Sequence, residues 1–95
     1  MKGTYKVPGG KLIRVDFEVA EGRISSFSLT GDFFLYPETG VDSINSSLTG
    51  CPINSKKIEE RVNRAIESNS LEIVGFSADD VAKAVVETNE KATAS

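Results

Sequence analysis

The chain has 95 residues, which is enough for one domain with a limited core and too few for two. Its net charge of −3 and pI near 4.9 argue against nucleic acid or an anionic membrane as the main partner. One cysteine excludes an internal disulfide, and no apolar run reaches membrane-spanning length. We therefore expect a single cytoplasmic domain over residues 1–95. The sequence has no histidine, so the usual general base near neutral pH is missing, which favours a chain without its own active site.

The first third of the chain has the two-residue period of β-strands. The alternating apolar residues are Ile13, Val15, Phe17 and Val19. This period predicts a strand with one buried face, and Glu21-Gly22 predicts the tight hairpin turn that follows it. Ile24 is out of phase with the next strand, over 23–30, which indicates a bulge. With the strand-like residues 5–7, the pattern predicts a three-stranded antiparallel meander.

The remaining sequence is mainly helical. Helix faces are predicted from Val41, Ile44 and Leu48, then from Ile58, Val62, Ala65 and Ile66, and last from Val81 and Val85. Ser55 is the predicted cap of the second helix, and Ser77 and Asp80 form a capping-box-like start for the third. Residues 31–37 are too irregular to predict a strand, and 71–76 form a short apolar connector.

Strands followed by helices predict an α+β fold of two layers, with about three helices on one face of a three-stranded antiparallel sheet. The other face would meet solvent or a partner. The side chains expected on it are Arg14, Asp16, Glu18, Ser26 and Ser28.

Several residues are candidates for binding or reactivity. Phe33 and Phe34 are adjacent, so in a strand-like segment they point to opposite sides, and a core role and an exposed anchor both stay open. Gly9-Gly10-Lys11 lacks the spacing and the following Ser or Thr of a P-loop, which favours a hairpin turn. Cys51 precedes a helix, whose N-terminus can lower a thiol pKa; the alternative is a half-buried residue in a turn before Pro52.

Three segments, in the same order, resemble the C-terminal domain of lipoate–protein ligases. They are Lys6-Val7-Pro8-Gly9-Gly10-Lys11-Leu12-Ile13-Arg14-Val15, then Gly22-Arg23-Ile24 with Thr30-Gly31-Asp32-Phe33-Phe34, and Leu48-Thr49-Gly50-Cys51. The most distinctive part is Asp32-Phe33-Phe34 followed by Pro37. Some ligases of this family carry the domain behind a large catalytic domain, and others make it as a separate chain. A sequence that begins at Met1 and contains only the small domain resembles the separate form.

The resemblance implies a non-catalytic accessory subunit that forms a heterodimer with the large catalytic subunit. It implies a need for this chain chiefly in the ATP-dependent activation of lipoate to lipoyl-adenylate. Lipoate, ATP and Mg²⁺ would bind to the large subunit, so that this chain alone binds no cofactor, and lipoyl-domain acceptor proteins would be met transiently. The candidates for contact with the large subunit or closure over the substrate are Lys6, Lys11, Arg14, Asp32, Phe33, Phe34 and Tyr36. Among them, Lys6, Lys11 or Arg14 would contact an adenylate phosphate or an acidic patch across the subunit boundary.

The alternative hypothesis is a role in sulfur relay or iron–sulfur assembly. The ligase domain is similar in fold to iron–sulfur scaffold and sulfur-acceptor proteins. One cysteine cannot supply the ligands of a cluster, whereas a sulfur acceptor needs only one thiol. Cys51 would carry that role.

Overall fold

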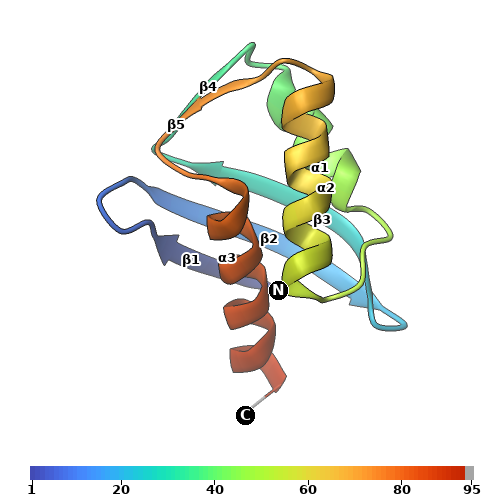
Figure 1. The fold of residues 1–95 in the computed structure, drawn as a ribbon. Coiled ribbons are helices and arrows are strands. Elements are labelled where there is room, and N and C mark those ends of the chain that lie inside the picture. The colour runs from blue at the N-terminus through green and yellow to red at the C-terminus, as the bar shows by residue number, and fades with distance from the viewer. Residues whose placement is uncertain (94–95) are drawn as a thin grey trace.

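The computed structural model describes residues 1–93 and shows an α+β fold, as the sequence predicts (Figure 1). The elements are β1 (Lys2–Lys6), β2 (Leu12–Ala20), β3 (Arg23–Gly31), β4 (Phe34–Tyr36), α1 (Gly40–Leu48), α2 (Ser55–Ser68), β5 (Glu72–Val74) and α3 (Ala78–Thr93). No helix within residues 1–93 is long and apolar enough to cross a membrane.

The main sheet is the predicted antiparallel meander, in the order β1-β2-β3. Alternation along β2 places Ile13, Val15 and Phe17 inward, where each is at most 2% exposed. The register between β2 and β3 shifts at Glu18/Val19, so that Val19 pairs with Ile24. This shift confirms the predicted bulge, because it returns Ile24 to the buried face, where it is 1% exposed.

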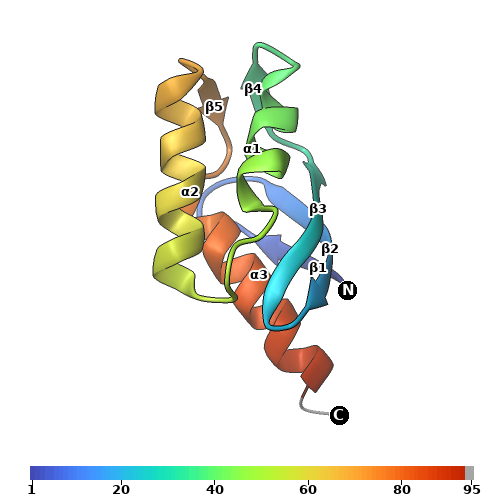
Figure 2. The same cartoon turned by 90° about the vertical axis from the view of Figure 1, so that its right-hand side faces the viewer.

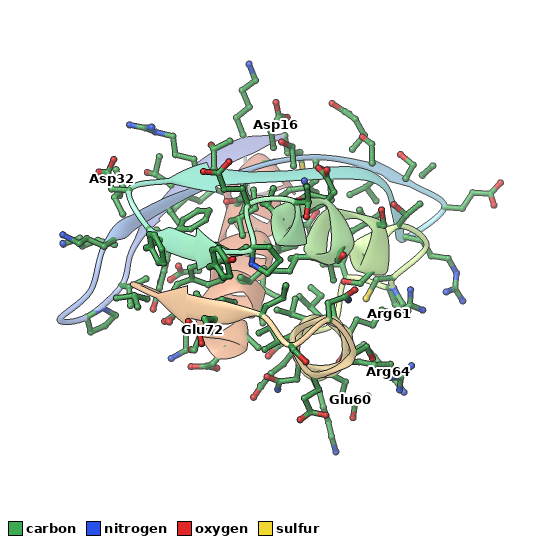
Figure 3. The ribbon with its side chains drawn as sticks, turned by 90° about the horizontal axis from the view of Figure 1, so that it is seen from above. Asp16, Asp32, Glu60, Arg61, Arg64 and Glu72 are labelled. Carbon is green, nitrogen blue, oxygen red and sulfur yellow. The ribbon has the colours of Figure 1, made fainter. Side chains whose placement is uncertain are left out.

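The opposite face of this sheet carries polar side chains and no helix. All five of the predicted residues are exposed: Arg14, Asp16, Glu18, Ser26 and Ser28. Figure 3 shows Asp16 on the side of the sheet away from the helices. Cross-strand rows run Lys2–Asp16–Ser28 and Thr4–Arg14–Thr30, and each row mixes charged and hydroxyl side chains.

The helices lie together on the other side of the sheet (Figure 2). α1 contacts β3, α3 contacts β1 and β2, and α2 packs against both helices. The core between these layers includes Phe17, Ile44 and Val62, each fully buried. β1 and α3 approach each other closely at Gly3, where a side-chain Cβ would overlap Thr88 of α3. Burial of apolar surface between the layers is the main force that holds the helices on the sheet.

Local side-chain hydrogen bonds set where two of the helices begin. Asn54, not Ser55 as the sequence predicts, caps α2: its Oδ1 accepts from the Lys57 backbone N–H at 3.1 Å. Asn54 has an extended backbone (φ −143°, ψ 123°), as an N-cap requires, whereas Ser55 is already helical. At α3 the predicted start is confirmed, because the Ser77 N–H and hydroxyl donate to the Asp80 carboxylate at 2.8 and 2.9 Å.

A second, two-stranded sheet was not expected from the sequence. β4 and β5 pair antiparallel, with Phe34 opposite Val74, Leu35 opposite Ile73 and Tyr36 opposite Glu72. The pair stands beyond the ends of β2 and β3, at one end of the molecule (Figure 1). Its inner face carries Leu35, which is 8% exposed. A side-chain Cβ at Gly40, the first residue of α1, would lie 2.9 Å from Leu35 Cδ2, so this helix start and β4 are in close contact.

Candidate interaction site

An exposed apolar face lies on the β4–β5 pair. Phe34, Tyr36 and Val74 are 61%, 60% and 63% exposed, and they are the exposed large hydrophobic residues of the described chain. Phe34 and Val74 are direct cross-strand partners, and Tyr36 is two residues beyond Phe34 on the same strand. Alternation therefore puts all three on one face, which we call the aromatic face. Phe34 and Tyr36 are among the residues for which the sequence predicts contact with a partner.

The neighbouring phenylalanine turns the other way. Phe33 is half-buried, and its ring packs edge-to-face against Phe76, with ring centroids 4.8 Å apart and an interplanar angle of 72°. The prediction that Phe33 and Phe34 point to opposite sides is confirmed: the Phe33 ring packs against the core and the Phe34 ring faces solvent. Their contact with a partner stays a prediction.

A hollow runs beside the aromatic face. It has a volume of about 420 Å³ and lies where β3 ends, β4 runs and α1 begins. Phe34, Tyr36 and Glu38 line it together with Leu29 and Val41. Two of the three aromatic-face side chains thus border a depression with a mostly apolar wall.

Lys6, Lys11 and Asp32 lie at the same end of the molecule. The Lys6 Nζ donates to the Gly10 carbonyl oxygen at 2.8 Å, which closes the β1–β2 hairpin and confirms the hairpin interpretation of the glycines. The Lys11 N–H donates to the Gly75 carbonyl oxygen at 3.2 Å, so the hairpin contacts the segment after β5. Asp32 is exposed, and its backbone N–H donates to the Leu12 carbonyl oxygen at 3.1 Å.

Arg14 is on a different surface. It projects from β2 on the outer face of the main sheet, where it lines a shallow hollow of about 450 Å³ with Lys2, Asp16 and Ser28. The structure therefore does not bring Arg14 onto the aromatic face with Phe34 and Tyr36. The predicted contact residues divide between the polar sheet face and the β4–β5 end.

Cys51 lies in the core. Its side chain is fully buried, and the thiol donates to the Pro52 carbonyl oxygen at 3.4 Å. Burial raises the pKa of the Cys51 thiol above its ordinary value, against the opposing charges of Arg61, Arg23 and Lys57. A nucleophilic or sulfur-carrying thiol needs the thiolate form and access to its donor. This geometry gives no support to the sulfur-relay alternative.

Within residues 1–93, no group of three His, Cys, Asp or Glu side chains is placed to hold a metal ion. The Gly9-Gly10 turn, the only glycine pair, is closed on itself by the Gly10 N–H donating to the Val7 carbonyl oxygen at 2.8 Å.

Sequence reasoning missed Val74 and Glu72, which share the aromatic face with Tyr36. Both were assigned to a connector. The sequence signal was weak, because Leu71, Glu72 and Ile73 alternate between apolar and polar but Val74, which is exposed in the structure, breaks the alternation. A strand of three residues is too short for this alternation to be distinguished from an irregular loop.

Comparison with known proteins places the chain in a family. A model of the bacterial lipoate protein ligase C-terminus matches residues 2–85. A solved structure of a bi-partite lipoate protein ligase from the archaeon Thermoplasma acidophilum contains a similar chain, with 25% identity and a TM-score of 0.75. The likeness covers 90% of this chain and 92% of that one. No curated protein sequence gave a significant match. The chain belongs to the family of lipoate protein ligase C-terminal domains.

Proposed function

We propose that this chain is the accessory subunit of a two-part lipoate protein ligase and forms a single domain over residues 1–95. The observation that supports the proposal best is the extent of the structural match. It takes in 90% of this chain and 92% of a chain from a bi-partite ligase, so the two chains are of similar size and correspond almost throughout. The family match over residues 2–85 agrees with this assignment.

The proposed role is in activation of lipoate by the large subunit. Activation joins the lipoate carboxylate to AMP and releases pyrophosphate, and the product is a mixed anhydride that water destroys. A small subunit that closes over the site can order the loops around the substrate and exclude water while the anhydride forms. It then moves aside so that the lysine of an acceptor protein can reach the lipoyl group.

The large subunit supplies the chemistry in this scheme. We assign lipoate, ATP and Mg²⁺ to it, as membership of the lipoate protein ligase family implies. The lipoyl-domain acceptor meets the complex transiently, and the complex works in the cytoplasm. Contact with the large subunit is assigned to the residues that the sequence singled out: Lys6, Lys11, Arg14, Asp32, Phe33, Phe34 and Tyr36.

Lipoate-dependent exchange between ATP and pyrophosphate tests this role directly. We expect the large ligase chain of the same organism to catalyse exchange only when this chain is present. Acyl transfer from added lipoyl-adenylate serves as the comparison, since it bypasses the activation step. If the large chain alone exchanges pyrophosphate at the full rate and does not associate with this chain, the proposed function is wrong.

A further inference from the structure

The aromatic face is the one exposed surface of the described chain where large apolar side chains gather. Phe34, Tyr36 and Val74 are each about 60% exposed, whereas the other large apolar residues among 1–93 are buried or partly buried. Leaving such side chains together in water is unfavourable, and in soluble proteins a cluster of this kind usually marks a protein-binding surface. Aromatic side chains are also the usual centres of binding energy in interfaces.

The face is held in place by packing behind it. Leu35, on the opposite side of β4, is buried, and its cross-strand partner Ile73 packs against the core. The Phe33–Phe76 ring contact joins the start of β4 to the segment after β5. The exposed rings therefore project from a two-stranded ribbon whose other face is packed against the domain. Because the ribbon is already ordered, less conformational entropy is lost when the rings bind a partner.

Carboxylates border the Tyr36 end of this face. Glu72 is exposed and stands directly opposite Tyr36, and Glu38 lines the hollow beside it. In Figure 3, Glu72 projects from β5 on one side of α2, and Arg61 and Arg64 lie on the other side of that helix. One basic residue, Lys11, adjoins Gly75, at the Phe34 end of the face.

These charges distinguish among the possible occupants. In a face-to-face dimer whose ribbons run in the same direction, the Glu72 and Glu38 carboxylates of two copies would come together. In any dimer, two chains that each carry a net charge of −3 approach one another. An anionic membrane would be repelled by the same groups. Like charges brought together at an interface cost binding energy, whereas opposite charges favour and orient association. The fitting occupant is a protein surface with an apolar pocket and basic side chains beside it.

We propose that the aromatic face docks on the large ligase subunit, with Phe34 and Tyr36 in an apolar pocket and Glu38 and Glu72 facing Lys or Arg side chains of that subunit. This inference rests on the proposed function and names the surface that carries it. It assigns docking to the β4–β5 end, and this contact is separate from the one proposed for Arg14 on the outer face of the main sheet.

The test measures the dissociation constant and association rate between this chain and the large ligase chain of the same organism. One variant combines Phe34→Thr, Tyr36→Thr and Val74→Thr, because threonine keeps the β-propensity of a strand. We expect binding to weaken by about 30-fold or more, the loss typical of one aromatic hot spot. A second variant combines Glu38→Lys and Glu72→Lys. It should associate more slowly and lose the salt dependence of the wild-type rate.

Glu18→Lys is the matched control, since Glu18 is an exposed strand carboxylate on the outer face, and it should bind like the wild type. Circular dichroism and thermal melting establish that each variant is folded; if the threonine variant is not, the charge variant decides. Binding within about threefold of wild type by the folded variants overturns the inference, while the proposed function stands. The inference is also overturned if the wild-type chain self-associates and the threonine variant does not, because the aromatic face would then bind a second copy of this chain. A wild-type chain that neither binds nor stimulates exchange overturns the proposed function itself.

Discussion

Gly31→Ala is expected to damage both the fold and the aromatic face. Gly31 is the last residue of β3, and its φ of +150° is one that side-chain-bearing residues rarely adopt. A Cβ there would lie 3.0 Å from Ile13 Cα and closer still to the Leu12 carbonyl oxygen. Both obstacles are backbone atoms of β2, so no side-chain rotation relieves the overlap. The same Leu12 oxygen accepts the Asp32 N–H at 3.1 Å, the hydrogen bond at the exit from β3.

The magnitude follows from two penalties. Forcing alanine into this backbone conformation costs about 1–3 kcal/mol. Inserting a methyl group against packed backbone costs about 1–3 kcal/mol more. The lower entropy of the unfolded alanine chain returns less than about 1 kcal/mol, so the expected net loss is about 3 kcal/mol. For a domain of this length, that loss corresponds to a fall of about 12–24 °C in the melting temperature.

Gly9→Ala is the control for positive φ without a clash. Gly9 has a φ of +70°, but a Cβ there would meet nothing within 4 Å, so we expect a loss of about 1 kcal/mol. Urea unfolding followed by circular dichroism gives both free energies of unfolding. Equal losses in the two variants would refute the steric argument for Gly31. If the argument is right, Gly31→Ala also weakens binding to the large ligase chain at temperatures where it is still folded, and Gly9→Ala does not.

Two further predictions concern α3 and the buried thiol. Asp80→Ala should lower the free energy of unfolding by about 1–3 kcal/mol, because the Ser77 N–H and hydroxyl lose their charged acceptor; Asp80→Asn, measured by the same urea titration, should lose less. Cys51→Ala should support pyrophosphate exchange like the wild type, and loss of exchange in a folded variant would revive the sulfur-relay hypothesis. The raised pKa of Cys51 also predicts a pH effect. The native thiol keeps its proton after the unfolded thiol has lost it, so this contribution to stability is present below about pH 9 and is lost as pH rises further. The difference between wild type and Cys51→Ala in urea titrations from pH 8 to 10.5 should show this loss, and a constant difference would contradict it.

Most of the main sheet and the helices could be predicted, because their patterns are long and local. In β2, a strand of nine residues, the alternation runs from Ile13 to Val19 and leaves one consistent assignment of faces. The bulge could also be predicted, because Ile24 breaks the alternation of its strand. The cap of α2 was missed by one residue because Asn54 and Ser55 are both good caps, and only the backbone angles distinguish them.

The candidate site was harder to predict, because it depends on pairing between segments far apart in the chain. β4 and β5 have three residues each, and neither is convincing as a strand without the other. Val74 and Glu72 gain their place beside Phe34 and Tyr36 only through that pairing. Local patterns contain no information about which distant segment supplies the partner.

The adjacent phenylalanines show what decides the site in physical terms. Strand geometry requires Phe33 and Phe34 to face opposite ways, but it does not say which of them is buried. The choice is made by Phe76, whose ring meets Phe33 edge-on. Gly75 permits that contact: its φ is +116°, and a Cβ there would lie 3.2 Å from Phe33 Cβ and 2.9 Å from Lys11 Cγ. Because Phe33 packs against the core, strand alternation places Phe34, and with it Tyr36, on the solvent side of β4. The aromatic face is therefore built into the packing of the domain, and an occupant is needed to bury it.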